Sequence, residues 1–187
     1  VVPMLIIAFY AFTKQGNDVR TVLFSLGNFV RFFSDQLFIS VLIRSLILAV
    51  ITTLICIVIG YPTAYIIAKL KPNSQSLMVL LITAPTLINM LVRTYAWHGI
   101  LLSTNFSAEI KVYNGMVYNF LHYMILQIYT SLSKMDQNLL VAASDLGCDP
   151  RTAFLKVTLP MSIPGVISGI TLVFLPAVSS FFIPKLL

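Results

Sequence analysis

The chain has 187 residues, of which 58% are hydrophobic and only 10% are charged. A soluble domain has about 25% charged residues, so this composition indicates an integral membrane protein. The net charge is +6, yet no basic cluster is long enough to form a nucleic-acid surface. Cytoplasmic loops that follow the positive-inside rule explain the excess of Lys and Arg better.

Apolar runs of about 20 residues mark the predicted membrane helices. Residues 1–12 are apolar but too short to cross a bilayer, and we interpret them as the outer half of a helix whose beginning is absent. Residues 14–35 are polar and mixed. A long helix is predicted over residues 37–68, with Gly60 and Pro62 near its inner end.

A short loop follows at residues 69–73, with two lysines and Pro72, which should stop the helix. The remaining apolar runs are residues 75–102, 115–132 and 161–187. Pro85 and Arg93 interrupt the first of these runs, and a polar patch at 103–114 precedes the second. The sequence therefore predicts an all-α, polytopic transmembrane bundle.

Basic residues in the connections predict the orientation of the helices. The connections at 69–73 and 133–160 carry Lys69, Lys71, Lys134, Arg151 and Lys156. The connection at 103–114 carries only Lys111, together with Glu109. We therefore expect the first two connections in the cytoplasm and residues 14–35 outside.

Residues 139–160, LLVAASDLGCDPRTAFLKVTLP, form an unusually polar stretch between two apolar runs. Asp136 can cap a helix here, and Gly147 can supply the left-handed residue that ends it. Asp149 at the N-cap and Pro150 at the first helical position then begin a second helix.

The second helix should have Ala153, Phe154 and Val157 on one side. Leu159-Pro160 should then turn the chain back toward the membrane. The small side chains of Ala142 and Ala143 would let the surface of a partner approach closely. An ordinary connecting loop is the alternative, because caps and glycine corners are common.

The spacing Val141-Ala142-Ala143, three residues, Gly147, nine residues, Val157-Thr158-Leu159-Pro160 resembles the EAA loop of bacterial ABC importer permeases. The pattern of that family is E-A-A, three residues, G, nine residues, I-x-L-P. The resemblance implies that the loop 134–160 contains a coupling helix, which lies in a groove of an ATP-binding subunit. It assigns coupling roles to Val141, Ala142, Ala143, Asp145, Gly147, Leu159 and Pro160. Val141 stands where the family has Glu, so a charge that could contact the ATPase is missing, and Val157 conservatively replaces Ile.

Four further stretches look like those of PotB-type permease subunits. They are IGYPTAYIIAKL at 59–70, APTLINMLVRTYAW at 84–97, SLSKMDQNLLVAASDLG at 131–147 and LVFLPAVSSFFIPKLL at 172–187. The resemblance runs from about Phe24 onward and implies a MetI-like fold with six membrane helices. We accordingly expect residues 1–187 to be a single permease domain truncated at both ends. Residues 105–115 are shorter than expected for the family, and His122 and Gln127 stand where prolines are expected.

The resemblance implies a permease subunit of an ATP-driven importer for spermidine or putrescine in the bacterial inner membrane. ATP and Mg would be held by a dimer of ATP-binding subunits, and this chain would hold no cofactor. The other implied partners are a second homologous permease subunit, an extracytoplasmic polyamine-binding protein and the lipid bilayer. No nucleic acid is expected.

Arg93 is unusual because an ionisable residue inside an apolar run normally faces the protein interior, although it could instead snorkel to the outer surface. All six acidic residues are expected in loops or near helix ends, so aromatic faces are the remaining candidates for binding a polycation. The candidate substrate path consists of Asn89, Arg93, Tyr95, Trp97, Tyr129 and Phe181, with Phe182 beside it. Packing or lipid contact explains each of these aromatic residues as well.

The sequence contains no catalytic constellation, since His98 and His122 are isolated and no P-loop, HExxH or GxSxG motif is present. We expect no enzymatic activity in this chain. Cys56 and Cys148 are predicted in a membrane helix and a cytoplasmic loop, as free thiols. Two alternatives stay open. One is a permease for another small solute such as an inorganic anion, for which Arg93 would be a natural ligand. The other is a membrane channel or scaffold, which would explain the helices but not the EAA spacing.

Overall fold

The computed structural model describes residues 2–15, 22–24, 34–102, 107–136, 138–145 and 147–180. The chain divides into two compact units, Val1–Leu46 and Ile47–Leu187. The first unit contains α1 (Val2–Ala11) and an antiparallel pair of short strands, β1 (Thr13–Gln15) and β2 (Val22–Phe24). The predicted short apolar helix at the start is confirmed. The strands fall almost entirely in the segment 14–35, which the sequence shows to be polar and mixed.

The long predicted helix is confirmed as α3 (Gln36–Ala68), a single helix of 33 residues that begins in the first unit and ends in the second. Two of its threonine hydroxyl groups are bonded within the helix. Thr53 Oγ1 donates to Ala49 O at 2.7 Å, and Thr63 Oγ1 donates to Ile59 O at 2.8 Å. These bonds satisfy polar side chains in a helix that has no water beside it in a bilayer.

Pro72 begins the next helix, α4 (Pro72–Thr83), so the loop is shorter than the predicted 69–73. The fixed φ of proline suits the first helical position, where the missing N–H costs nothing. Gln75, in the first turn of α4, donates from Nε2 to Ala68 O at 3.0 Å and to Leu70 O at 2.8 Å. One side chain thereby satisfies two carbonyl groups at the end of α3.

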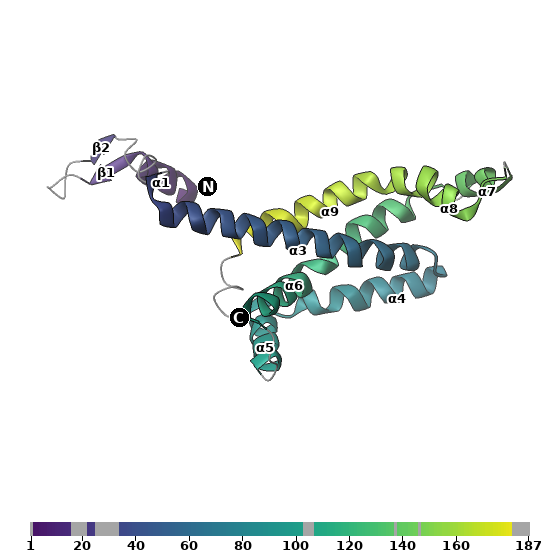
Figure 1. Cartoon of the computed structure of the whole chain (residues 1–187), viewed down its shortest axis with the longest axis horizontal. Helices are drawn as coiled ribbons and strands as arrows, with labels where there is room; N and C mark the ends of the chain where they lie inside the picture. Colours follow the sequence, from purple (N-terminus) through teal and green to yellow (C-terminus); the bar gives the residue numbers. More distant parts are fainter. Residues whose placement is uncertain are drawn as a thin grey trace. The chain divides into compact units, whose positions relative to one another are not determined.

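The apolar run at residues 75–102 does not form one helix. A 3₁₀ turn, η1 (Ala84–Leu87), follows α4, and α5 (Met90–Leu102) then leaves at 91° to the α4–η1 segment (Figure 1). Ile88 is extended, and Asn89 Oδ1 accepts a hydrogen bond from Leu91 N at 2.8 Å, which caps the new helix. Arg93 lies inside α5 and does not interrupt it, which corrects the expectation from the sequence.

The helix predicted over 115–132 is longer, and runs as α6 over Ala108–Ser133. It begins inside the predicted polar patch, because Glu109 in the first turn complements the positive end of the helix dipole. α6 supplies much of the core of the second unit. Its buried apolar side chains are Val112, Met116, Phe120, Met124, Ile125, Ile128 and Leu132.

The polar stretch 139–160 and the residues beside it fold into α7 (Asn138–Asp145), α8 (Pro150–Ala153) and a π-helical turn, η2 (Phe154–Thr158), which leads directly into α9 (Leu159–Ser179). The predicted turn at Leu159-Pro160 is therefore wrong. In the π turn, Leu159 N donates to Phe154 O, five residues back. A wider turn gives the proline ring, which would otherwise clash with the preceding carbonyl groups, room to continue the helix.

Glycines let α9 approach α6 closely (Figure 1). A Cβ atom on Gly165 would lie 2.5 Å from Ser131 Cβ and 2.8 Å from the backbone oxygen of Gln127. A Cβ atom on Gly169 would lie 2.6 Å from Met124 Sδ. The spacing Gly-xxx-Gly aligns both glycines on one face of α9, a motif that lets membrane helices pack with their backbones close together.

Two helices in the described part of the chain are long and apolar enough to cross a membrane, Phe38–Ala68 and Pro150–Ser179, and a third span is possible if the bent pair α4–α5 counts as one. α6 is long but more polar. Its buried face explains the difference, because a helix covered by α3 and α9 needs fewer lipid-compatible side chains. Cys56 is buried in α3, Cys148 is partly exposed after α7, and both are free, as predicted.

Candidate functional site

The corner after α7 is built as the sequence predicts. Gly147 has φ +75°, the left-handed conformation that an L-residue with a side chain rarely adopts. Cys148 N donates to Ala143 O at 3.0 Å, five residues back. This is the Schellman arrangement that ends a helix and satisfies one of its last carbonyl groups.

Two aspartates cap the helices on either side of the corner, as predicted. Asp136 Oδ1 accepts from Asn138 N at 2.9 Å, at the start of α7. Asp149 Oδ2 accepts from Arg151 N at 3.2 Å, and Pro150 occupies the first turn of α8. Both caps depend on residues within two positions of each other, which is why local sequence rules found them.

The predicted coupling residues are spread over α7, the corner and the first turn of α9. Val141, Ala142, Ala143 and Asp145 lie in α7, Gly147 forms the corner, and Leu159 and Pro160 begin α9. Ala142 and Asp145 are exposed, but Ala143 is only 9% exposed. The expectation that both alanines face a partner is therefore wrong for Ala143, because adjacent helical residues point about 100° apart.

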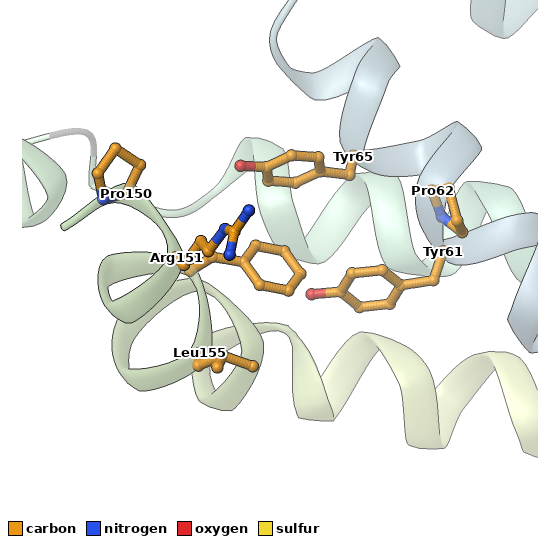
Figure 2. A pocket seen from close by; sticks show the side chains of 7 residues that line it. Tyr61, Pro62, Tyr65, Pro150, Arg151 and Leu155 are labelled. Atoms are coloured by element: carbon orange, nitrogen blue, oxygen red, sulfur yellow. The ribbon is translucent and has the colours of Figure 1, made fainter.

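Phe154 connects the corner to α3. Its ring makes edge contacts with the rings of Tyr65, at 5.2 Å between centroids, and Tyr61, at 6.0 Å. Figure 2 shows both tyrosines reaching from α3 toward Pro150 and Arg151. The Tyr61 hydroxyl also lies 2.9 Å from Ser162 Oγ, in the first turn of α9. The segment α8–η2 is thus in contact with α3 and continuous with α9.

Arg93 and Trp97 lie one turn apart on α5 and face α6. The ring of Trp97 packs edge-on against Tyr118, with centroids 5.1 Å apart. One turn further along both helices, Arg93 interacts electrostatically with His122. This antiparallel register places the guanidinium group against protein, as the first interpretation of Arg93 requires.

Arg93 on α5, and Asn119 and His122 on α6, have buried side-chain atoms without a hydrogen bond in the described part of the chain. Arg93 Nε and Nη1, Asn119 Oδ1 and His122 Nε2 have no hydrogen-bond partner there. Asn119 is 2% exposed and His122 is 6% exposed. Arg93 and His122 therefore have unpaired nitrogen atoms that a polar group between them could bind.

The other candidate path residues lie elsewhere. Asn89 caps α5, and Tyr95 is 58% exposed. Tyr129 donates from its hydroxyl group to Gln75 Oε1 at 3.2 Å, and lies seven residues from His122 on α6, which is about 10 Å along the axis. Phe181 and Phe182 lie outside the described residues. Among the candidates that the structure describes, only Arg93 and Trp97 come together.

The described acidic residues stay at helix ends, as expected. Asp35 directly precedes α3, and Glu109, Asp136, Asp145 and Asp149 lie in first turns, caps or last residues. The Gly165–Gly169 pair was not among the residues predicted from the sequence. The spacing of the glycines in an apolar run was an available signal for the pair.

The sequence matches, over residues 57–187, the family described as "Binding-protein-dependent transport system inner membrane component". The chain belongs to this family. It is similar to the spermidine/putrescine transport system permease protein PotB of Haemophilus influenzae, with 34% identity over 98% of this chain and 70% of that protein. PotB of Escherichia coli K12 is 32% identical over 98% of this chain and 73% of its own length. The inner membrane ABC transporter permease protein YdcU of Escherichia coli K12 is 24% identical over 95% of this chain and 66% of its own length.

The permease is thus an inner-membrane transport subunit of an ABC importer and not an enzyme. Such a subunit works in a complex with an ATPase and a substrate-binding protein. The matched family region begins in the middle of α3 and includes the corner, the Phe154 contact and the α6–α9 packing.

Proposed function

We propose that the permease carries spermidine or putrescine across the inner membrane. The observation that supports this proposal most is the similarity to PotB proteins, which extends over nearly all of the chain at 32–34% identity. The proposed partners are two ATP-binding subunits that hold ATP and Mg, a second homologous permease and an extracytoplasmic polyamine-binding protein. In this proposal the permease itself holds no cofactor.

The corner at Gly147 is the proposed contact with the ATPase. α7 projects from a fixed turn, with Ala142 and Asp145 exposed on its surface. A displacement of this segment would reach the membrane helices by two routes. One route is the continuous helix from α8 through η2 to α9, and the other is the contact of Phe154 with Tyr61 and Tyr65.

We propose the same substrate path as the sequence suggested, which consists of Asn89, Arg93, Tyr95, Trp97, Tyr129 and Phe181. Among these residues, Arg93 and Trp97 are supported best, because they share one face of α5. An aromatic ring attracts an ammonium group through its negative face, whereas a fixed guanidinium charge repels it. The two residues would therefore act on a polyamine in opposite directions.

One observation favours a second candidate, the transport of an inorganic anion. Buried donor atoms of Arg93 have no partner within the described part of the chain, and charge-assisted bonds to an anion would satisfy them. Uptake of labelled spermidine and of labelled sulfate into vesicles that contain the full complex separates the two candidates. Spermidine uptake that survives Arg93→Gln supports the polyamine proposal. Sulfate uptake that is lost in Arg93→Gln, without spermidine uptake in the parent protein, contradicts it.

A further inference from the structure

An apolar groove lies between the end of α3 and the α8–η2 segment (Figure 2). Its volume is about 540 Å³. The lining residues are Tyr61, Pro62, Tyr65, Pro150, Arg151, Phe154 and Leu155. All of them except Arg151 present mainly hydrocarbon, and Leu155 is 59% exposed in this groove. The groove is therefore suited to an apolar chain, with one cationic group in its wall.

The walls of the groove are held in place without an occupant. Phe154 contacts both tyrosine rings edge-on, at 5.2 and 6.0 Å, and the Tyr61 hydroxyl is fixed 2.9 Å from Ser162 Oγ. Ala153, next to Phe154, is 7% exposed, which anchors α8. A preformed groove needs little ordering of its side chains when a ligand binds.

The groove lies at the cytoplasmic boundary of the membrane. Tyr61 and Tyr65 occupy the last two turns of α3, a helix apolar enough to span the bilayer. Lys69 and Lys71 follow at once, and basic residues after a membrane helix mark its cytoplasmic end. Tyrosine also favours this interface. Anionic lipids give the cytoplasmic leaflet its negative surface potential.

Two cations lie beside the groove. Arg151 lines it, and Lys69 Nζ lies 4.3 Å from the centroid of the Tyr65 ring. Asp149 is close to Arg151 in the chain, and its Oδ2 accepts a hydrogen bond from the backbone N–H of Arg151. Arginine can bind a phosphate group through two parallel hydrogen bonds.

We propose that this groove binds an anionic phospholipid from the cytoplasmic leaflet. One acyl chain lies along Tyr61, Phe154 and Leu155, and the headgroup phosphate pairs with Arg151 and Lys69. An uncharged groove would accept any lipid chain, whereas the two cations select an anionic headgroup. The bound lipid fills the space between α3 and α8, beside the corner proposed to contact the ATPase.

The test uses the full complex in vesicles that contain a trace of phosphatidylglycerol with a photoreactive group on its acyl chain. After illumination, the labelled peptides are located by mass spectrometry. We expect the label on residues 61–65 and 150–155, and about fivefold less of it there in Arg151→Gln and in Lys69→Gln. Lys71→Gln is the matched control, because it removes a cation from the same loop outside the groove, and it should label like the parent protein.

Several outcomes would overturn the proposal. Equal labelling by a phosphatidylcholine probe would show that the headgroup is not recognised. A loss of labelling in Lys71→Gln as large as in Arg151→Gln and Lys69→Gln would show a general effect of surface charge. Displacement of the lipid by free inorganic phosphate would assign the cations to a soluble anion. If the label appears only after the ATPase is removed, a segment of the ATPase occupies the groove. Parent-like labelling by both Arg151→Gln and Lys69→Gln would place the lipid elsewhere.

Discussion

The hydroxyl groups of Tyr61 and Ser162 lie 2.9 Å apart and join α3 to the first turn of α9. Ser162 is fully buried, and its Oγ also lies 2.8 Å from Leu159 O. The serine can donate only one proton, so when it donates to Leu159 O, the tyrosine hydroxyl must be the donor between the two side chains. This bond connects two helices through residues that lie 101 positions apart in the chain.

Removal of this bond should destabilise the protein modestly. Tyr61→Phe and Ser162→Ala should each lower the free energy of unfolding in detergent by about 0.5–1.5 kcal/mol. The double variant should cost little more than Ser162→Ala alone, since that variant already loses the bond to Tyr61 as well as the bond to Leu159 O. Denaturant titration of all four proteins measures the coupling. Full additivity of the two single effects would mean that the hydroxyl groups act independently.

The left-handed corner should tolerate asparagine but not valine. Gly147 has φ +75°, where a β-branched side chain is strongly disfavoured and asparagine is among the tolerated residues. Gly147→Val should remain in the membrane but lose most of the ATP hydrolysis that accompanies transport, whereas Gly147→Asn should keep it. The rate of ATP hydrolysis by the reconstituted complex checks both variants. Parent-like activity of Gly147→Val would contradict the role of this corner in coupling.

The close approach of α9 to α6 should make Gly165 sensitive to a single methyl group. In Gly165→Ala the new Cβ would lie 2.5 Å from Ser131 Cβ, and overpacking of this kind costs about 1–3 kcal/mol. Gly99→Ala is the matched control, since nothing lies within 4 Å of its added Cβ. The midpoint of thermal unfolding in detergent should fall for Gly165→Ala and not for Gly99→Ala. Adding Ser131→Gly should recover part of the loss, because it removes the closest side-chain atom.

Replacing Val141 by the glutamate found at this position in the family should leave α7 intact. Val141 lies in α7, and Val141→Glu would add a carboxylate that can form a charge-assisted bond to a donor on the ATPase. We expect ATPase binding to the permease to stay the same or tighten in a pull-down titration, with unchanged expression. Clearly weaker binding would indicate that the ATPase surface has changed to match valine.

The aromatic face of Trp97 should contribute to polyamine affinity. Trp97→Leu keeps apolar bulk but removes the ring, which is worth about 0.5–2 kcal/mol per ammonium group. Apparent spermidine affinity in the uptake assay should fall several-fold. Tyr118→Leu is the control, because it removes the packing partner of Trp97 and leaves the indole ring. Equal losses of affinity in both variants would assign the effect to packing instead.

Local chemistry in the sequence determined several features of the structure correctly. The apolar run ending at Ala68 is one helix, Asp136 and Asp149 cap helices, and Gly147 turns left-handed. Each of these depends on residues a few positions apart and on the backbone preferences of Asp, Pro and Gly. The short-range spacing of the EAA-like loop also indicated the family, which the comparison with known proteins confirmed.

Other features depend on which helices lie side by side, and only the tertiary structure decided them. Pro85 could have kinked one helix, but the chain turns by 91° after the 3₁₀ turn that contains it. Pro160 could have ended a helix, but a π turn lets the helix continue. Ala143 faces inward, and Arg93 acquires His122 as a neighbour only because α5 lies against α6. A sequence pattern gives the face of a helix on which a residue lies, but the energetic consequence of that position is fixed by the neighbouring helix, whose residues are distant in the chain.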